Sequence, residues 1–312
     1  MISETGRTNC IAIWCSSANA QSTFHGLEVH FNLWNLGKKK NVNCFLDIGV
    51  MKPNATNVSN INIFIPKLVA KSHIQDLGIA FRKNPDLVST LFNEDYRVSS
   101  GAQEKIIDVL NIDRIPVFYI YVLDLNNDVL IENAYCGSII RIQIPKKLAN
   151  EKLYFRIRLK SPYVDSISRI YTTPNSILEG AFSQTELVDF RINEKRNLNT
   201  SLLEKMHSEG EVSFNKTHLF LMRQASDDYV YSHKPPSGSR QLEMDLWEGY
   251  IDGAYSSDKV IAYHWKETDI HHSFSAFAKF RYMRCSPLTI ATFIIIIIIL
   301  GFLSGLAANF LS

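Results

Sequence analysis

The last part of the sequence places the strongest limit on what this chain can be. No residue from Leu288 to Ala308 carries a charge, and the centre of this block is an unbroken isoleucine run from Ile294 to Ile299. At about 1.5 Å per residue, a helix of this length matches a bilayer hydrocarbon core of about 30 Å. A buried helix of a soluble protein is rarely apolar on all sides over so many turns. The block therefore predicts a transmembrane helix over 288–310. Its expected membrane-anchoring residues include Ile294, Ile297 and Leu300.

The charges beside this block predict its orientation. Lys279, Arg281 and Arg284 precede it, and no charged side chain follows Arg284. The positive-inside rule therefore places the part of the chain before the helix in the cytoplasm. The N-terminal apolar run from Cys10 to Cys15 is too short for a signal peptide. We expect a tail-anchored, single-pass membrane protein, in the inner membrane if the chain is bacterial.

Basic and aromatic residues alternate in a juxtamembrane segment, 271–287, directly before the predicted helix. Phe280 stands between Lys279 and Arg281, and Arg284 follows three residues later. Aromatic rings beside cations suit the headgroup region, where the rings anchor the chain and the cations meet anionic lipid. We expect these four residues at the membrane interface. The same pattern also fits an edge strand of the soluble region that ends at the membrane.

Within the predicted helix, Gly301 and Gly305 form a G-x-x-x-G pair. Small residues at this spacing let two transmembrane helices approach closely, although a single match also arises by chance. The expected partners are therefore the lipid bilayer and either a second copy of the chain or another protein that binds the cytosolic region.

Apolar and polar residues alternate with period two through most of the remaining sequence. The alternating segments are rich in β-branched and aromatic residues, which is typical of strands with one buried face. The predicted strands are His25–Trp34, Val42–Val50, Asn60–Ile65, Ile115–Leu123, Ser138–Ile144, Lys152–Lys160, Leu187–Ile192, His218–Met222, Lys259–Trp265 and Ser273–Tyr282. Because one-sided burial favours antiparallel pairing, we predict a mainly β (α+β) fold. Its cytosolic region is an antiparallel β-sandwich with a short helical insertion, followed by one C-terminal transmembrane helix.

The predicted domain organisation follows from breaks in this alternation. A first β-rich unit covers 1–165 with a helical insertion at 72–111, and a second covers 166–270. In the insertion, Pro85 marks the first turn of a short helix. Apolar spacing predicts two further helices, over Gln103–Leu110 and Asn199–His207.

The strand Lys152–Lys160 has the cleanest alternation in the chain. Its apolar residues, from Leu153 to Leu159, are expected to face the core. The intervening Arg156 and Arg158 are expected to face outward, because charged side chains are seldom buried without partners.

Composition and motifs limit the classes of function. The formal net charge is only +2, without a long basic stripe, so no dedicated nucleic-acid surface is expected. The sequence contains no P-loop, Rossmann, nucleophile-elbow or zincin motif. We therefore predict no cofactor and favour a protein that is not an enzyme, although missing motifs do not exclude one.

The densest polar cluster lies in the segment 186–197. Asp189, Glu194 and Lys195 resemble a carboxylate–lysine arrangement of nucleases, in which carboxylates hold a metal ion and lysine stabilises charge. The glutamate and the lysine are adjacent, so the usual spacing is not met. The alternative is a solvated strand face that runs into a turn.

A second polar cluster combines His264, Asp269, His271 and His272. Imidazole and carboxylate groups so close in sequence could bind a divalent metal ion or sense pH. A polar loop between two strands explains the same residues, so no metal is predicted. His25 and His30 fall on opposite faces of a strand and need another segment to form a site.

The leading functional hypothesis is a tail-anchored membrane protein whose cytosolic β-rich region is a binding or sensing module. By analogy of architecture with bacterial antiviral defence, such a module would trigger an effector helix that oligomerises and disrupts the membrane. The alternative is a membrane-anchored hydrolase or nuclease that uses Asp189, Glu194 and Lys195.

Overall fold

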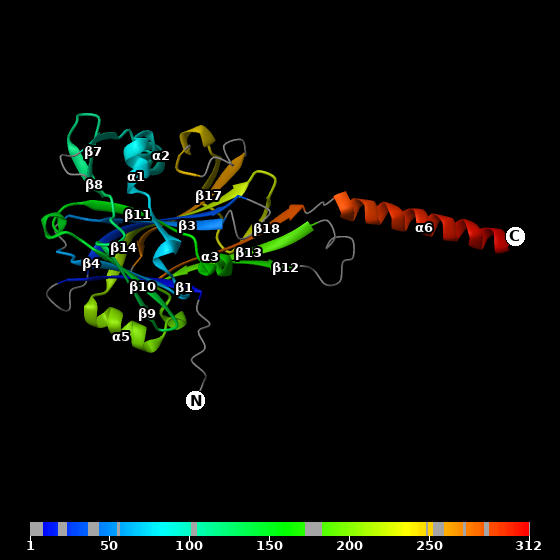
Figure 1. Cartoon of the computed structure of the whole chain (residues 1–312), viewed down its shortest axis with the longest axis horizontal. Helices are drawn as coiled ribbons and strands as arrows, with labels where there is room; N and C mark the ends of the chain where they lie inside the picture. The colour runs from blue at the N-terminus through cyan, green and yellow to red at the C-terminus, as the bar shows by residue number, and fades with distance from the viewer. Residues whose placement is uncertain are drawn as a thin grey trace.

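Two β-sheets stacked face to face form the body of the protein, and one long helix projects from it (Figure 1). The structure is a computed structural model. It describes residues 9–17, 24–36, 44–54, 57–100, 105–171, 183–247, 249–251, 259–270, 273–283 and 287–311. The mainly β fold predicted from the alternation is confirmed, and each predicted strand is present.

The smaller sheet has eight strands. In spatial order they are β15 (Asp228–Ser232), β18 (Phe274–Met283), β13 (Ser183–Ile192), β1 (Cys10–Ser16), β4 (Asn60–Ile65), β10 (Gly137–Gln143) and β9 (Val129–Ala134), with β12 (Ser168–Tyr171) paired to β13.

The larger sheet has ten strands. In spatial order they are β16 (Gly238–Gln241), β17 (Val260–Ile270), β14 (Val212–Gln224), β2 (Phe24–Asn35), β3 (Cys44–Lys52), β11 (Leu153–Leu159), β8 (Pro116–Tyr121), β7 (Ile106–Leu110) and β6 (Arg97–Ser100), with β5 (Ile74–Asp76) paired to β11.

Both sheets are mixed rather than purely antiparallel. Strand β1 pairs in parallel with β13, β2 pairs in parallel with β14, and β8 pairs in parallel with β11. The first two pairs join the beginning of the chain to strands that come much later. Strands from both sides of residue 165 therefore share both sheets, and the predicted boundary does not divide the strands into two sandwiches.

The main core fills the space between the sheets. Alternate residues of each strand point into it, as the period-two pattern predicts. Leu27, Val29 and Phe31 of β2 and Ile11 and Ile13 of β1 belong to this core and are almost fully buried. Burial of such apolar area is the main stabilising contribution to folding.

A second core covers the outer face of the large sheet. It contains Trp34 and Phe45 from the sheet, Phe81 from α1 (Gly78–Lys83), and Trp247 and Tyr250 from the segment that includes η4 (Met244–Trp247). A smaller cluster lies on the outer face of the small sheet under α5 (Thr200–Glu209).

This second core corrects the expectation for Arg156 and Arg158. Both point away from the main core, but both are buried, with side chains 0% and 2% exposed. Asp47, also fully buried, accepts hydrogen bonds from Arg158 Nε at 2.7 Å and from Tyr250 Oη at 2.7 Å. Trp34 Nε1 donates to the same carboxylate at 2.9 Å. The arginines are thus paired inside the protein rather than solvated.

The helical predictions are confirmed in part. The helix after Pro85 is α2 (Asp86–Phe92), and the helix predicted over Asn199–His207 is α5, with Asn199 accepting a hydrogen bond from Ser201 N at 2.8 Å. The segment Gln103–Leu110 was predicted to be helical, but β7 occupies its described part because it pairs with β6 and β8. The remaining short elements are α3 (Pro162–Ile167), η1 (Lys71–His73), η2 (Lys146–Leu148) and η3 (Lys195–Asn197).

The helix α6 (Pro287–Leu311) stands apart from the sandwich (Figure 1). Of the described helices it alone is long and apolar enough to cross a membrane, over Ile290–Ala307, and none of that stretch is buried in the body. Ile294, Ile297 and Leu300 are 51%, 66% and 60% exposed. These features fit a single-pass insertion. Neither Gly301 nor Gly305 has another atom within 4 Å of an added Cβ, so both lie open on the helix surface.

The strand β18 leads to α6 and corrects the expectation for Phe280. The ring of Phe280 is 0% exposed, belongs to the main core and packs against Tyr229 and Tyr263. It is therefore a core residue and not an interfacial one. Nor is β18 an edge strand, because it lies between β15 and β13. The side chains of Lys279 and Arg281 point to the other face, while Arg284 lies outside the described residues.

Candidate functional site

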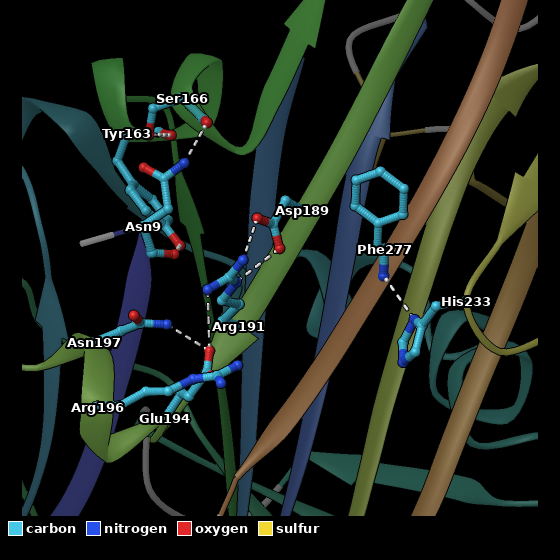
Figure 2. A network of polar contacts seen from close by, with 10 residues as sticks. All are labelled: Asn9, Tyr163, Ser166, Asp189, Arg191, Glu194, Arg196, Asn197, His233 and Phe277. Atoms are coloured by element: carbon cyan, nitrogen blue, oxygen red, sulfur yellow. Dashed lines mark hydrogen bonds and ion pairs between the residues drawn. The ribbon is translucent and has the colours of Figure 1, made fainter. Parts of the chain in front are cut away.

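The predicted carboxylate–lysine cluster is a set of ion pairs on the outer face of β13 (Figure 2). Arg191 donates two hydrogen bonds to Asp189, at 2.9 and 2.8 Å, and its Nη1 lies 3.3 Å from Glu194 Oε2. The Asp189 pairing raises the pKa of Arg191 further, so its charge is permanent. Arginine thus occupies the position between the two carboxylates where a metal ion would have to bind.

The third member of that cluster points elsewhere. Lys195 Nζ bonds Glu211 Oε1 at 3.1 Å, and its side chain is 58% exposed. Glu194 also pairs with Arg196 and accepts a hydrogen bond from Asn197 Nδ2 at 2.6 Å (Figure 2). Asp189, Glu194 and Lys195 therefore do not converge on one point, and this arrangement fits the solvated strand face.

The predicted histidine cluster is only partly described. His264 lies on β17, whereas His271 and His272 lie outside the described residues, as does the side chain of Asp269. Among the residues that the structure describes, no group of three or more histidine, cysteine, aspartate or glutamate side chains is placed to hold a metal ion.

His264 instead belongs to a cavity of about 570 Å³ on the outer face of the large sheet. Outward-facing side chains of β2, β14 and β17 form its floor, beside the short strand β16. The rest of the lining comes from Met51 of β3, from the end of α2 and the residues after it, with Phe92 and Tyr96, and from Phe118 and Lys152. The cavity therefore brings together segments from the beginning, the middle and the end of the body.

Three histidines from three neighbouring strands cross the cavity floor. His30 lies directly opposite His218 in the parallel β2–β14 pair. His218 Nδ1 lies 3.0 Å from His264 Nε2, a hydrogen bond in which one of the two rings donates. The His30 and His218 ring centroids are 4.8 Å apart. We call His30, His218 and His264 the histidine row.

Aromatic carbon rings continue this floor. The ring of Phe220 stacks on His264 with centroids 4.1 Å apart and an interplanar angle of 3°. Phe92 contacts His30 with centroids 5.5 Å apart and Phe118 with centroids 5.0 Å apart. The cavity therefore offers several aromatic ring surfaces, on the sheet and on the segments beside it.

Burial keeps the histidine row uncharged near neutral pH. Burial lowers the pKa of His218 and of His264 to about 4, and the nearby Lys266 acts in the same direction on both. Burial also lowers the pKa of His30 well below its ordinary value, with His218 and Arg156 adding to the effect. Neutral imidazoles both donate and accept hydrogen bonds, so the row is a polar surface without net charge.

Four cationic and two acidic side chains also line the cavity. Lys216 lies 3.6 Å from Glu28, and Lys152 lies over the ring of Phe118 at 5.9 Å. Among the described residues, no carboxylate forms an ion pair with Lys152, Arg240 or Lys266. The cavity therefore has an excess of positive charge at neutral pH, which favours an anionic ligand.

The low pKa of the histidine row predicts acid sensitivity. Between about pH 6.5 and pH 4 the unfolded chain binds protons that the folded row does not, so the free energy of unfolding should fall as the pH falls through this window. Lys216, Lys266 and Arg240 face the row and also oppose its protonation. The His218→Gln/His264→Gln variant should show a shallower loss of thermal stability over the same window.

The matched control for this prediction is His207→Gln, at a side chain on α5 that is 80% exposed. It should lose stability with acidification as the unchanged protein does. Equal pH slopes for the double variant and the unchanged protein would contradict a neutral histidine row.

In comparisons with protein families and with curated proteins, no family model and no curated protein matches this chain. The function of the candidate site is therefore inferred from its geometry.

Proposed function

We propose that this protein is a membrane-anchored binding module, in which α6 holds the β-sandwich at the membrane and the sandwich binds a small ligand. The observation that carries the proposal is the cavity of about 570 Å³, in which Lys152, Arg240 and Lys266 form no ion pair with any described carboxylate. Pockets for small molecules usually measure about 300–1,000 Å³ and combine apolar walls with a few polar groups. The cavity lining has four cations and two carboxylates, and this excess of positive charge favours an anion.

The anchor and its orientation complete this proposal. We propose that the sandwich lies in the cytoplasm, on the inner membrane if the cell is bacterial. Lys279 and Arg281 lie ahead of α6 on β18, and the positive-inside rule supports this orientation. Because β18 is a central strand of the small sheet, the sandwich and the helix are joined through a hydrogen-bonded strand. We propose that Gly301 and Gly305 serve self-association of the helix in the bilayer.

The test is ligand-dependent stability of the full chain in detergent micelles. Nucleotides, sugar phosphates, carboxylic acids, amino acids and fatty acids are added in turn, and the unfolding temperature is measured. At least one anionic class should raise it, because a ligand that binds only the folded state stabilises that state. The Arg240→Glu/Lys266→Glu variant should lose this shift, since two of the cavity cations become carboxylates.

Two controls separate this proposal from its rivals. Lys67→Glu/Lys83→Glu makes the same charge change at exposed lysines outside the cavity and should keep the shift. Asp189→Ala removes a member of the cluster considered for a hydrolase or nuclease and should also keep it. A panel in which no class stabilises the protein, or a shift that survives Arg240→Glu/Lys266→Glu, would refute a ligand site in this cavity.

A further inference from the structure

Two cations flank a pair of stacked rings on the cavity floor. In the pairing of β14 with β17, Phe220 lies opposite His264 and His218 lies opposite Lys266. Arg240 of β16 lies opposite Ala262, one step beyond His264 on the same face of β17. Along β17, His264 and its ring partner Phe220 therefore have Arg240 on one side and Lys266 on the other, and Lys266 is level with His218.

From this pattern, and assuming the proposed binding function, we infer that the ligand is a nucleotide, with its base on the aromatic floor and its phosphates on the cations. Phe220, His264 and His218 lie nearly parallel, with interplanar angles of 3° and 6°. Aromatic side chains presented in this way stack well with planar bases, and cations bind phosphate oxygens.

Space for a planar group exists beside these rings. Gly238 of β16 pairs with His264, and an added Cβ on Gly238 would meet no atom within 4 Å. Because Gly238 has no side chain, it leaves open space next to the stacked rings, at a position that lines the cavity. Tyr96 and Phe92 add further ring surface from the residues at the end of α2.

The acidic lining residues fit the remaining part of such a ligand. Glu28 and Glu94 lie among the cavity residues, and carboxylates accept hydrogen bonds from sugar hydroxyls and from amino groups of bases. A polyphosphate would leave the aromatic floor uncovered. A fatty acid would meet only one of the cations, because they lie on both sides of the rings.

The test measures direct binding to the full chain in detergent micelles by isothermal titration calorimetry. The ligands are the four ribonucleoside triphosphates and monophosphates, with tripolyphosphate and adenosine as the two halves of the molecule. At least one nucleotide should bind at least tenfold more tightly than tripolyphosphate or adenosine.

Two variants test which residues bind the phosphates and which bind the base. Arg240→Glu/Lys266→Glu should weaken nucleotide binding at least tenfold and flatten its salt dependence. Phe220→Leu should weaken it several-fold and leave the salt dependence unchanged, and Phe92→Leu serves in its place if the first variant unfolds early. Lys67→Glu/Lys83→Glu should bind as the unchanged protein does.

The outcomes separate this inference from the proposed function. Tripolyphosphate that binds as tightly as the best nucleotide would overturn the inference in favour of a plain anion site. Binding of another ligand class, lost in Arg240→Glu/Lys266→Glu, with no nucleotide bound, would overturn the inference and leave the proposed function standing. If no class binds, both fail.

Discussion

Removal of residues 287–312 is expected to transfer the protein from the membrane fraction to the supernatant almost completely. The span Ile290–Ala307 makes no buried contact with the sandwich, so its loss uncovers no core. A fully apolar helix of this length gains its favourable free energy only in lipid. The measurement is the partition of the protein between pellet and supernatant after alkaline extraction of membranes.

Two variants of the full chain sharpen this result. Ile294→Lys/Ile297→Lys/Leu300→Lys puts three charges at the centre of the helix, each costing about 2.5–3.5 kcal/mol in insertion, and should also release the protein. Gly301→Leu/Gly305→Leu keeps the helix apolar and should stay in the pellet. A truncated protein that remains in the pellet while folded would contradict the assignment of α6 as the anchor.

Replacement of Asp47 by asparagine is expected to cause the largest loss of stability among single substitutions considered for the body. Asp47 is fully buried and is the carboxylate partner of Arg158, with Arg156 Nη2 at 3.9 Å. Its loss leaves two buried guanidinium groups with no counterion among the described residues, which costs about 3–5 kcal/mol. For a protein of this size the unfolding temperature should fall by about 5–15 °C, measured on the full chain in micelles.

The matched control for Asp47→Asn is Glu132→Gln, the same change from carboxylate to amide. Glu132 is 52% exposed and lies 3.9 Å from Arg141, so its loss should change stability by less than about 1 kcal/mol. The double variant Asp47→Asn/Arg158→Gln should be less destabilised than the sum of its single changes, because the two residues share one network. An Asp47→Asn protein as stable as the control would show that the buried network contributes little.

The strands were largely predictable because their main-core face carries a local signal. Apolar residues at every second position mark β2, β4, β11 and β18 without knowledge of any partner strand. The helix predicted where β7 lies is wrong, because Ile106, Ile107 and Leu110 fit helical spacing as well as a strand. Its pairing with β6 and β8 decided the outcome, and such pairing is not a local property.

The outer layer of the large sheet was not predictable in the same way. Arg156 and Arg158 read as solvent-facing, because their burial depends on Asp47 from β3 and on Tyr250 from a distant covering segment. The interfacial role expected for Phe280 failed for a related reason. The alternation of β18 set its ring inward, but only the neighbouring strands show that the inward side is the main core.

The candidate site shows the same limit. Alternation places His218 and His264 on the outer faces of their strands, so this position could be predicted from the sequence, whereas their partial burial could not. Their contact with His30 depends on the parallel pairing of β2 with β14, two strands that are far apart in the sequence. Asp189, Glu194 and Lys195 are more conspicuous because they lie close together in the sequence. In the structure, however, the two carboxylates pair with Arg191, and Lys195 pairs with Glu211.

The parallel seam between β2 and β14 has a consequence for the order of folding. During synthesis β2 is made long before its partner, with only β3 available at one of its edges. Pairings between strands so distant in sequence form slowly, because the entropic cost of closing the long loop comes before the favourable free energy of the contacts. The cavity floor spans this seam, so it exists only in a body that has completed its closure. A nascent or partly folded chain would therefore not bind the ligand, and only the fully folded protein would have an occupied site.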